Sequence, residues 1–159
     1  MYPDLDESIK KALDAAKTDK TLNVPILQHY TILFPGQNVQ TPQPRRIMIY
    51  NYDNGLDSTG YDSDERKVYY ILEVGIKKVN YLEAQKLSRD VTTAIIKVLR
   101  KSQLFEKYSQ YMDVEKITPE YDKHLTLIKA HVQLAFRVTE DYGVEEEEFD
   151  TINLNVEVE

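Results

Sequence analysis

The hydrophobic residues near the start of the chain recur at a helical spacing. Leu5, Ile9, Leu13 and Ala16 follow one another at intervals of three or four positions, which places them on one face of an α-helix. The pattern therefore predicts a helix over residues 3–17 that turns this apolar face towards a core.

A longer helical pattern occupies the middle of the chain, over residues 80–102. Asn80 is suited to cap the first turn, and Glu83 follows three positions later, a combination typical of helix starts. The expected apolar stripe comprises Ala84, Leu87, Val91, Ile95 and Val98 or Leu99. Residues 103–112 then predict a short helical turn.

Strict alternation of apolar and polar residues, typical of β-strands, marks residues 67–78 and 124–138. Residues 26–34 and 45–52 are rich in β-branched and aromatic residues and also predict strands, as does the alternation over residues 151–159. In the two most regular strands, the positions expected to face the core are Val68, Tyr70, Leu72, Val74, Ile76, Ile128, Ala130, Val132, Leu134, Phe136 and Val138. Gly75 interrupts the first of these strands and suggests a bulge or a close approach of another backbone.

The order of these elements is helix, strands, long helix, strands, which predicts an α+β fold. We expect a single antiparallel-rich β-sheet, with the N-terminal helix and the long amphipathic helix packed on one face. The other face should be polar, as antiparallel sheets permit. The chain of 159 residues contains no internal repeat and is predicted to form a single domain over residues 1–159.

Two acidic segments separate the predicted strands. Residues 51–66, "NYDNGLDSTGYDSDER", are much longer than the 2–5 residues of ordinary hairpin loops, and residues 140–150 include the run Glu145 to Glu148. Like charges repel one another in such segments, so both are predicted to be mobile, solvated loops.

Composition narrows the functional classes. The formal net charge is −7, which argues against tight binding to the outside of a nucleic-acid duplex, because Lys and Arg supply most of that affinity. The chain has no cysteine, which excludes disulfides, thiolate ligands and cysteine nucleophiles. Its first residues are acidic and lack the apolar core of a signal peptide, and no run is long enough for a membrane span. We therefore expect a protein without membrane association that is made in the cytoplasm.

Calcium binding by the first acidic segment is one candidate chemistry. Asp53, Asp57, Asp62, Asp64 and Glu65 could supply oxygen ligands. An EF-hand loop needs acids or amides at positions 1, 3 and 5 and glycine at position 6, and counting from either Asp53 or Asp57 breaks that pattern. A solvated, turn-rich segment is the better interpretation.

A metal-dependent nuclease is the enzymatic alternative, with Asp62, Asp64 and Glu73 holding Mg²⁺ and Lys77 polarising a phosphate. The spacing of these residues is loose. The chain's histidines, His29, His124 and His131, have no zinc-ligand spacing, and no phosphate-binding or nucleophile motif occurs. We therefore expect a non-enzymatic protein with no cofactor and no metal.

The layout resembles the small tail-completion proteins of long-tailed bacteriophages, the tail terminators above all. The resemblance is carried by the acidic segment quoted above and by "KVYYILEVGIKK", "YLEAQKLSRDVTTAIIKVLRKS", "LTLIKAHVQLAFRV" and "INLNVEVE". It implies a virion structural protein that forms a ring, typically a hexamer, at the head-proximal end of the tail tube. Such a ring stops tube growth and joins the tail to the neck, and DNA passes through its lumen without specific binding.

The resemblance also implies partners and contact residues. The partners are other copies of the chain, the tail tube protein and a neck or head-completion protein. Contacts with a neighbouring copy or the tube would come from Asp53, Asn54, Gly55, Asp57, Tyr61, Asp62, Asp64 and Glu65, and Glu145, Glu146, Glu147 and Glu148 could line an acidic lumen. Two alternatives remain besides the nuclease: a head-completion or stopper protein of the same neck, and a monomeric adaptor whose acidic loop binds a basic partner.

Overall fold

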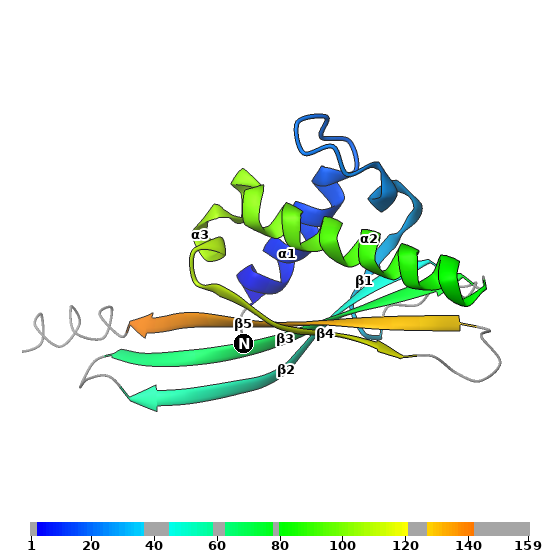
Figure 1. Ribbon diagram of the computed structural model, residues 1–159. Coiled ribbons are helices and arrows are strands. Elements are labelled where there is room, and N and C mark those ends of the chain that lie inside the picture. The colour runs from blue at the N-terminus through cyan, green and yellow to red at the C-terminus, as the bar shows by residue number, and fades with distance from the viewer. Residues whose placement is uncertain (1–2, 37–44, 59–62, 78–79, 121–126, 142–159) are drawn as a thin grey trace, which may run out of the picture.

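The computed structural model describes residues 3–36, 45–58, 63–77, 80–120 and 127–141. One five-stranded sheet forms the first layer, and the helices form a second layer on one of its faces (Figure 1). The predicted α+β class is confirmed. The helical elements are α1 (Pro3–Ala16), η1 (Pro25–His29), α2 (Tyr81–Lys101), η2 (Gln103–Phe105) and α3 (Glu106–Ser109). The strands are β1 (Thr31–Leu33), β2 (Arg46–Ser58), β3 (Ser63–Lys77), β4 (Met112–Glu120) and β5 (Leu127–Asp141).

The sheet has the order β1-β2-β3-β5-β4, so β3 is its central strand. Strands β1 and β2 are parallel, and every other neighbouring pair is antiparallel. The pairing of β3 with β5 is unbroken from Ser63 opposite Asp141 to Lys77 opposite Leu127. This long register fixes which side chains of the two strands share a face.

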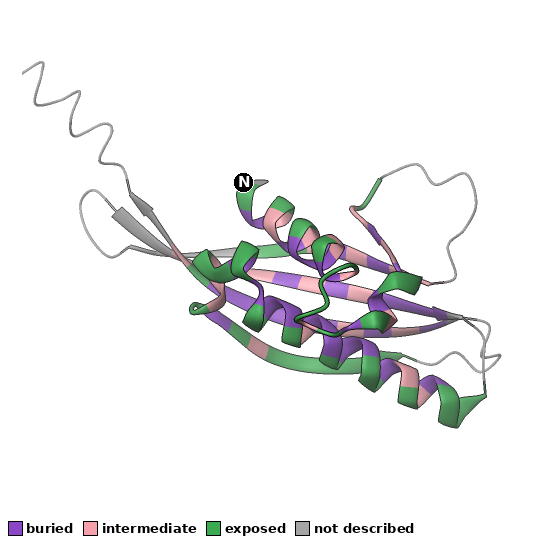
Figure 2. Ribbon diagram, turned by 90° about the horizontal axis from the view of Figure 1, so that it is seen from above, coloured by how far each residue is buried: buried purple, intermediate pink, exposed green. Residues whose placement is uncertain are grey.

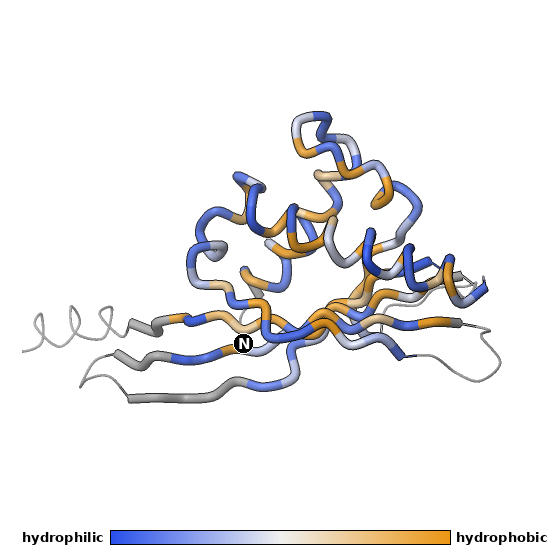
Figure 3. Tube along the Cα trace, viewed as in Figure 1, coloured by the Kyte–Doolittle hydropathy of each residue, from blue (hydrophilic) through white to orange (hydrophobic). Residues whose placement is uncertain are grey.

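Alternation along β3 and β5 produces the two faces, as the sequence predicts. The even-numbered residues from Val68 to Ile76 and from Ile128 to Phe136 have essentially no exposed surface. They pack beneath the helices, where hydrophobic residues gather between the two layers (Figure 3). The opposite face of the sheet bears the polar and aromatic residues of the alternation.

The helices bury their apolar stripes against this core. Along α2, buried and exposed positions alternate at the helical period (Figure 2), and the Asn80 side chain accepts a hydrogen bond from the Glu83 backbone amide at 2.9 Å, as expected of the cap. The Tyr70 hydroxyl donates to the Asp6 carboxylate and so joins β3 to α1. Among the helices of the described ranges, none is long and apolar enough to cross a lipid bilayer.

The prediction and the structure differ at one predicted strand and at one strand that was not predicted. Residues 26–34 do not form one strand: the segment begins with η1, which follows Pro25, and only the three residues of β1 are extended. Strand β4 is absent from the sequence prediction because most of its residues are exposed and Pro119 lies within it. A proline is tolerated there because β4 is at the edge of the sheet.

The predicted acidic loop over residues 51–66 is wrong in its extent. Strand β2 continues to Ser58 and β3 begins at Ser63, and the two remain paired up to Ser58 opposite Asp64. Backbone hydrogen bonding between long strands therefore takes up most of this segment despite its polar sequence. The predicted loop over residues 140–150 overlaps the end of β5 at its first two positions, and its remainder lies outside the described residues, as does the predicted strand over residues 151–159.

Candidate functional site: the outer face of the sheet

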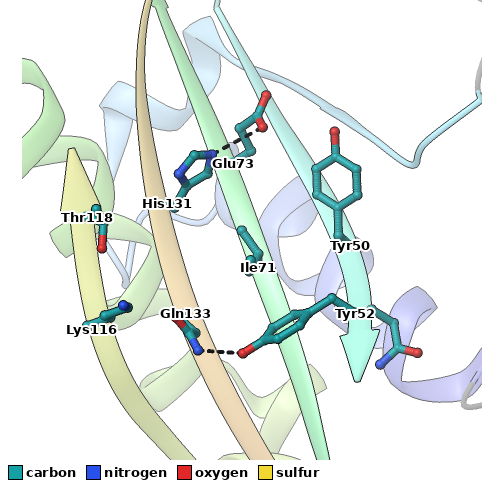
Figure 4. A pocket seen from close by; sticks show the side chains of 9 residues that line it. Tyr50, Tyr52, Ile71, Glu73, Lys116, Thr118, His131 and Gln133 are labelled. Carbon is teal, nitrogen blue, oxygen red and sulfur yellow. Dashed lines mark hydrogen bonds and ion pairs between the residues drawn. The ribbon is translucent and has the colours of Figure 1, made fainter. Parts of the chain in front are cut away.

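We call the face of the sheet opposite the helices the outer face. In the described residues it contains a shallow hollow of about 460 Å³ (Figure 4). The floor and rim of the hollow come from four neighbouring strands. The lining residues are Tyr50, Asn51 and Tyr52 of β2, Ile71 and Glu73 of β3, His131 and Gln133 of β5, and Lys116 and Thr118 of β4.

Glu73 is the centre of an ion-pair cluster on this face. Its carboxylate lies 3.5 Å from Arg46 Nη2, 3.8 Å from Lys129 Nζ and 3.2 Å from His131 Nε2. The other ring nitrogen of His131, Nδ1, lies 3.9 Å from a carboxylate oxygen of Glu120. The Glu73 side chain is only 13% exposed, so its charge is held by neighbouring cations more than by water.

Gly75 allows Arg46 to reach this cluster. The two residues are opposite each other in the β2–β3 register, and a Cβ atom on Gly75 would lie 3.1 Å from Arg46 Cγ. That separation is tighter than ordinary van der Waals contact. The close approach that the sequence suggested at Gly75 is therefore made by the Arg46 side chain, which crosses the glycine on its way to Glu73.

A β-bulge positions the aromatic rim of the hollow. The β2–β3 register shifts between Asn51 and Asp53, so Tyr52 is the extra residue. Its ring centroid lies 5.7 Å from that of Tyr69, and its hydroxyl accepts a hydrogen bond from Gln133 Nε2 on β5 (Figure 4). Partial burial raises the pKa of the Tyr50 and Tyr52 hydroxyls above its usual value, so both remain neutral donors at physiological pH.

A second ion pair crosses the same face towards the strand extension described below. Lys67 Nζ lies 3.5 Å from Glu115 Oε1 and 5.5 Å from the centroid of the Tyr69 ring. The neighbouring Tyr69 and then Glu115 raise the pKa of Lys67, which keeps it charged. Ala135 of β5 lies between Lys67 and Glu115 and is almost fully buried. Its small side chain leaves room for this ion pair to cross β5.

The described part of the chain does not bring together the residues considered above for a nuclease centre. Asp64 and Glu73 are nine positions apart on one uninterrupted strand, so their backbones are separated by roughly 30 Å. Glu73 is already engaged by three basic side chains. Asp62 lies outside the described residues, and within the described part of the chain no group of three His, Asp or Glu residues is arranged to hold a metal.

The predicted contact residues lie instead in a projecting part of the sheet. We call it the strand extension: residues 53–58 of β2, 63–66 of β3 and 138–141 of β5. Figure 1 shows these strand ends running beyond the helices. Of the predicted contact residues, those in the extension are Asp53, Asn54, Gly55, Asp57, Asp64 and Glu65, whereas Tyr61, Asp62 and Glu145 to Glu148 lie outside the described residues.

Comparison with known proteins finds no relative, so the function has to be inferred from the geometry of the protein. No protein-family model matches the sequence, and a search of curated proteins finds no significant match. The features that bear on function are therefore the hollow, the ion-pair cluster around Glu73 and the acidic strand extension.

The sequence alone did not identify the outer face as a candidate site. Glu73 and His131 are 58 positions apart and meet only because β3 pairs with β5 in this register. The alternation pattern places each of them on the polar side of its own strand. The missing information was which strands are neighbours, since the chain places α2 and β4 between β3 and β5.

Proposed function

We propose that this protein is a non-enzymatic structural subunit that assembles into a ring, acting as the tail terminator of a long-tailed bacteriophage. The observation that carries the proposal is the strand extension. A small domain that builds three paired strands beyond its own hydrophobic core gains little stability from them. Such strands are explained by contacts made outside the subunit.

The character of the candidate site supports the same proposal. The carboxylate in the hollow, Glu73, is already ion-paired with Arg46 and Lys129 and lies 3.2 Å from His131, an arrangement that serves structure as well as it would serve chemistry. Tyrosine is abundant, with 12 residues in the chain, and three of them, Tyr50, Tyr52 and Tyr69, are on or beside the hollow. Tyrosine is enriched at protein–protein interfaces.

Charge supports the proposed position on the DNA path. The net charge of −7 gives a ring of such subunits a strongly negative field. A negative lumen repels the phosphate backbone and lets a duplex pass without adhering to the wall. The proposed partners are the tail tube protein on one side of the ring and a neck protein on the other.

The test is to measure the mass of the purified protein by light scattering after size exclusion, and to image it by negative stain with and without purified tail tubes. We expect rings with a central hole, or caps at one end of the tubes that stop further tube growth. Binding to head connectors without binding to tubes would favour the stopper alternative. A monomer that ignores both would overturn the proposal.

A further inference from the structure

The exposed side of α2 is basic, although the chain as a whole is acidic. The chain has 20 basic and 27 acidic residues, whereas the exposed positions of α2 carry five basic side chains and two acidic ones. Exposed positions recur along the whole length of the helix (Figure 2). The basic ones are Lys86, Arg89, Lys97, Arg100 and Lys101, and the acidic ones are Glu83 and Asp90. The charge of this helix surface is therefore opposite to that of the whole protein.

Four of these cations lie in one line along the helix, which we call the basic stripe: Lys86, Arg89, Lys97 and Arg100. At about 3.6 residues per turn, they and the exposed Thr93 between them fall within about a quarter of the helix circumference. Both acidic residues lie to one side of that sector. With a rise of about 1.5 Å per residue, the stripe is about 21 Å long.

The charges of the basic stripe are not used inside the subunit. Among the residues that the structure describes, none of the four has an ion-pair partner. Arg100 Nη1 donates hydrogen bonds to the backbone carbonyls of Ser109 and Met112, at 3.2 and 2.8 Å, which hold the guanidinium in place without neutralising it. The helix dipole favours cations in the last turn and so accounts for Arg100, but it does not account for Lys86 and Arg89 in the first half.

The make-up of the basic stripe fits a polyanion better than a protein partner. The centres of protein–protein interfaces are depleted of charged residues and enriched in aromatic ones. The stripe instead has charges throughout, and the exposed Leu82 lies only at its N-terminal end. Cations repeated at intervals of one or two helical turns match a ligand whose own charge repeats regularly, as phosphate charges do along a nucleic-acid backbone.

We infer that the basic stripe of α2 binds the phosphate backbone of nucleic acid without reading its sequence. Phosphate contacts position a protein on a duplex but carry no sequence information. The net charge of −7 repels the duplex from the rest of the subunit and keeps the contact weak, so a bound duplex can slide. The inference does not depend on the ring; within the proposed ring it places α2 next to the passing DNA.

The salt dependence of binding tests this inference. The probe is a fluorescently labelled DNA duplex of about 20 base pairs, and its anisotropy is measured on titration with the full chain between about 20 and 200 mM salt. If each of the four cations neutralises one phosphate, the logarithm of the binding constant should fall against the logarithm of the salt concentration with a slope of about −3.6. Two duplexes of unrelated sequence should bind equally.

Single substitutions locate the contact on the stripe. Lys97→Gln and Arg89→Gln should each reduce the magnitude of the slope by about 0.9 and weaken binding at least about threefold at low salt. The matched controls are Lys116→Gln and Arg137→Gln, which make the same charge changes at exposed positions on the other side of the sheet. Both controls should bind like the wild type.

Three other results would be decisive, once circular dichroism shows that every variant is folded. Absence of salt-dependent binding by the wild type, or equal losses in the stripe and control variants, would overturn the inference and leave the proposed ring standing. Tighter binding of poly-glutamate than of the duplex, at equal charge concentration, would assign the stripe to an acidic protein and also overturn it. DNA binding by a protein that never forms rings would support the inference and overturn the proposed function alone.

Discussion

At the scale of single residues, two buried tyrosines differ in how their hydroxyls are satisfied. The Tyr70 ring packs edge-on against Phe136, with centroids 5.8 Å apart, and its hydroxyl donates to Asp6. Tyr30 is only 2% exposed, and its hydroxyl has no hydrogen-bond partner in the described part of the chain. A buried polar atom without a partner costs free energy, so the two hydroxyls should contribute to stability with opposite sign.

Replacing Tyr30 with phenylalanine should raise the free energy of unfolding by about 1 kcal/mol, because the substitution removes the unpaired hydroxyl and keeps the ring. Urea denaturation at pH 7 measures the change. Tyr111→Phe is the control, since Tyr111 is 52% exposed and its substitution should be nearly neutral. A loss of stability in Tyr30→Phe would show that the hydroxyl is bonded after all.

The same residue predicts a pH dependence. Burial raises the pKa of Tyr30 in the folded protein above its usual value of about 10. Above that pH the unfolded chain releases the proton while the folded protein retains it. The part of the unfolding free energy that is linked to the protonation of Tyr30 is thus fully present below about pH 10, and it is lost as the pH rises through the folded-state pKa. Stability measured from pH 9 to 11 should fall less steeply in Tyr30→Phe than in the wild type.

For Tyr70 the expected effect is destabilisation. Tyr70→Phe preserves the ring contact with Phe136 but leaves the Asp6 carboxylate without its donor, which should cost about 2 kcal/mol. A double-mutant cycle with Asp6→Asn measures the coupling, because the effects of two residues in direct contact are not additive. Strictly additive effects would show that the bond contributes nothing.

At the scale of elements, long periodic segments were predictable and short or edge segments were not. Alternation identified β3 and β5, and a stripe of apolar residues identified α2, because each buries one face over many residues. Strand β4 is mostly exposed and so has no such pattern. The part of β2 that follows Tyr52 has the sequence of a loop. It forms a strand because it pairs with β3, and local sequence propensity does not encode that pairing.

The helix start is a feature that the sequence predicted correctly at a single residue. Asn80→Ala should lower the free energy of unfolding by about 1 kcal/mol, because the Glu83 amide would lose the hydrogen bond that Asn80 provides. Thermal or urea denaturation measures the loss. Asn80→Ser keeps a capping oxygen and should change stability by much less. Equal losses in the two variants would point to a role for the amide group other than capping.

At the scale of the whole molecule, burial and contact surfaces are separated. The helix layer and the inner side of the sheet supply the hydrophobic core, whereas the hollow lies on the outer face, away from that core. Substitutions of exposed residues that line the hollow should therefore have little effect on folding.

The position of β3 at the centre of the sheet has a consequence for synthesis on the ribosome. Its first neighbour, β2, is made just before it, but its second, β5, begins only at Leu127, after α2 and β4. While those elements emerge, the nascent chain carries an open edge on its central strand, and unpaired edges promote aggregation. Chains growing on one message expose the same edge close together. We therefore expect the yield of folded protein to fall as the density of translating ribosomes rises.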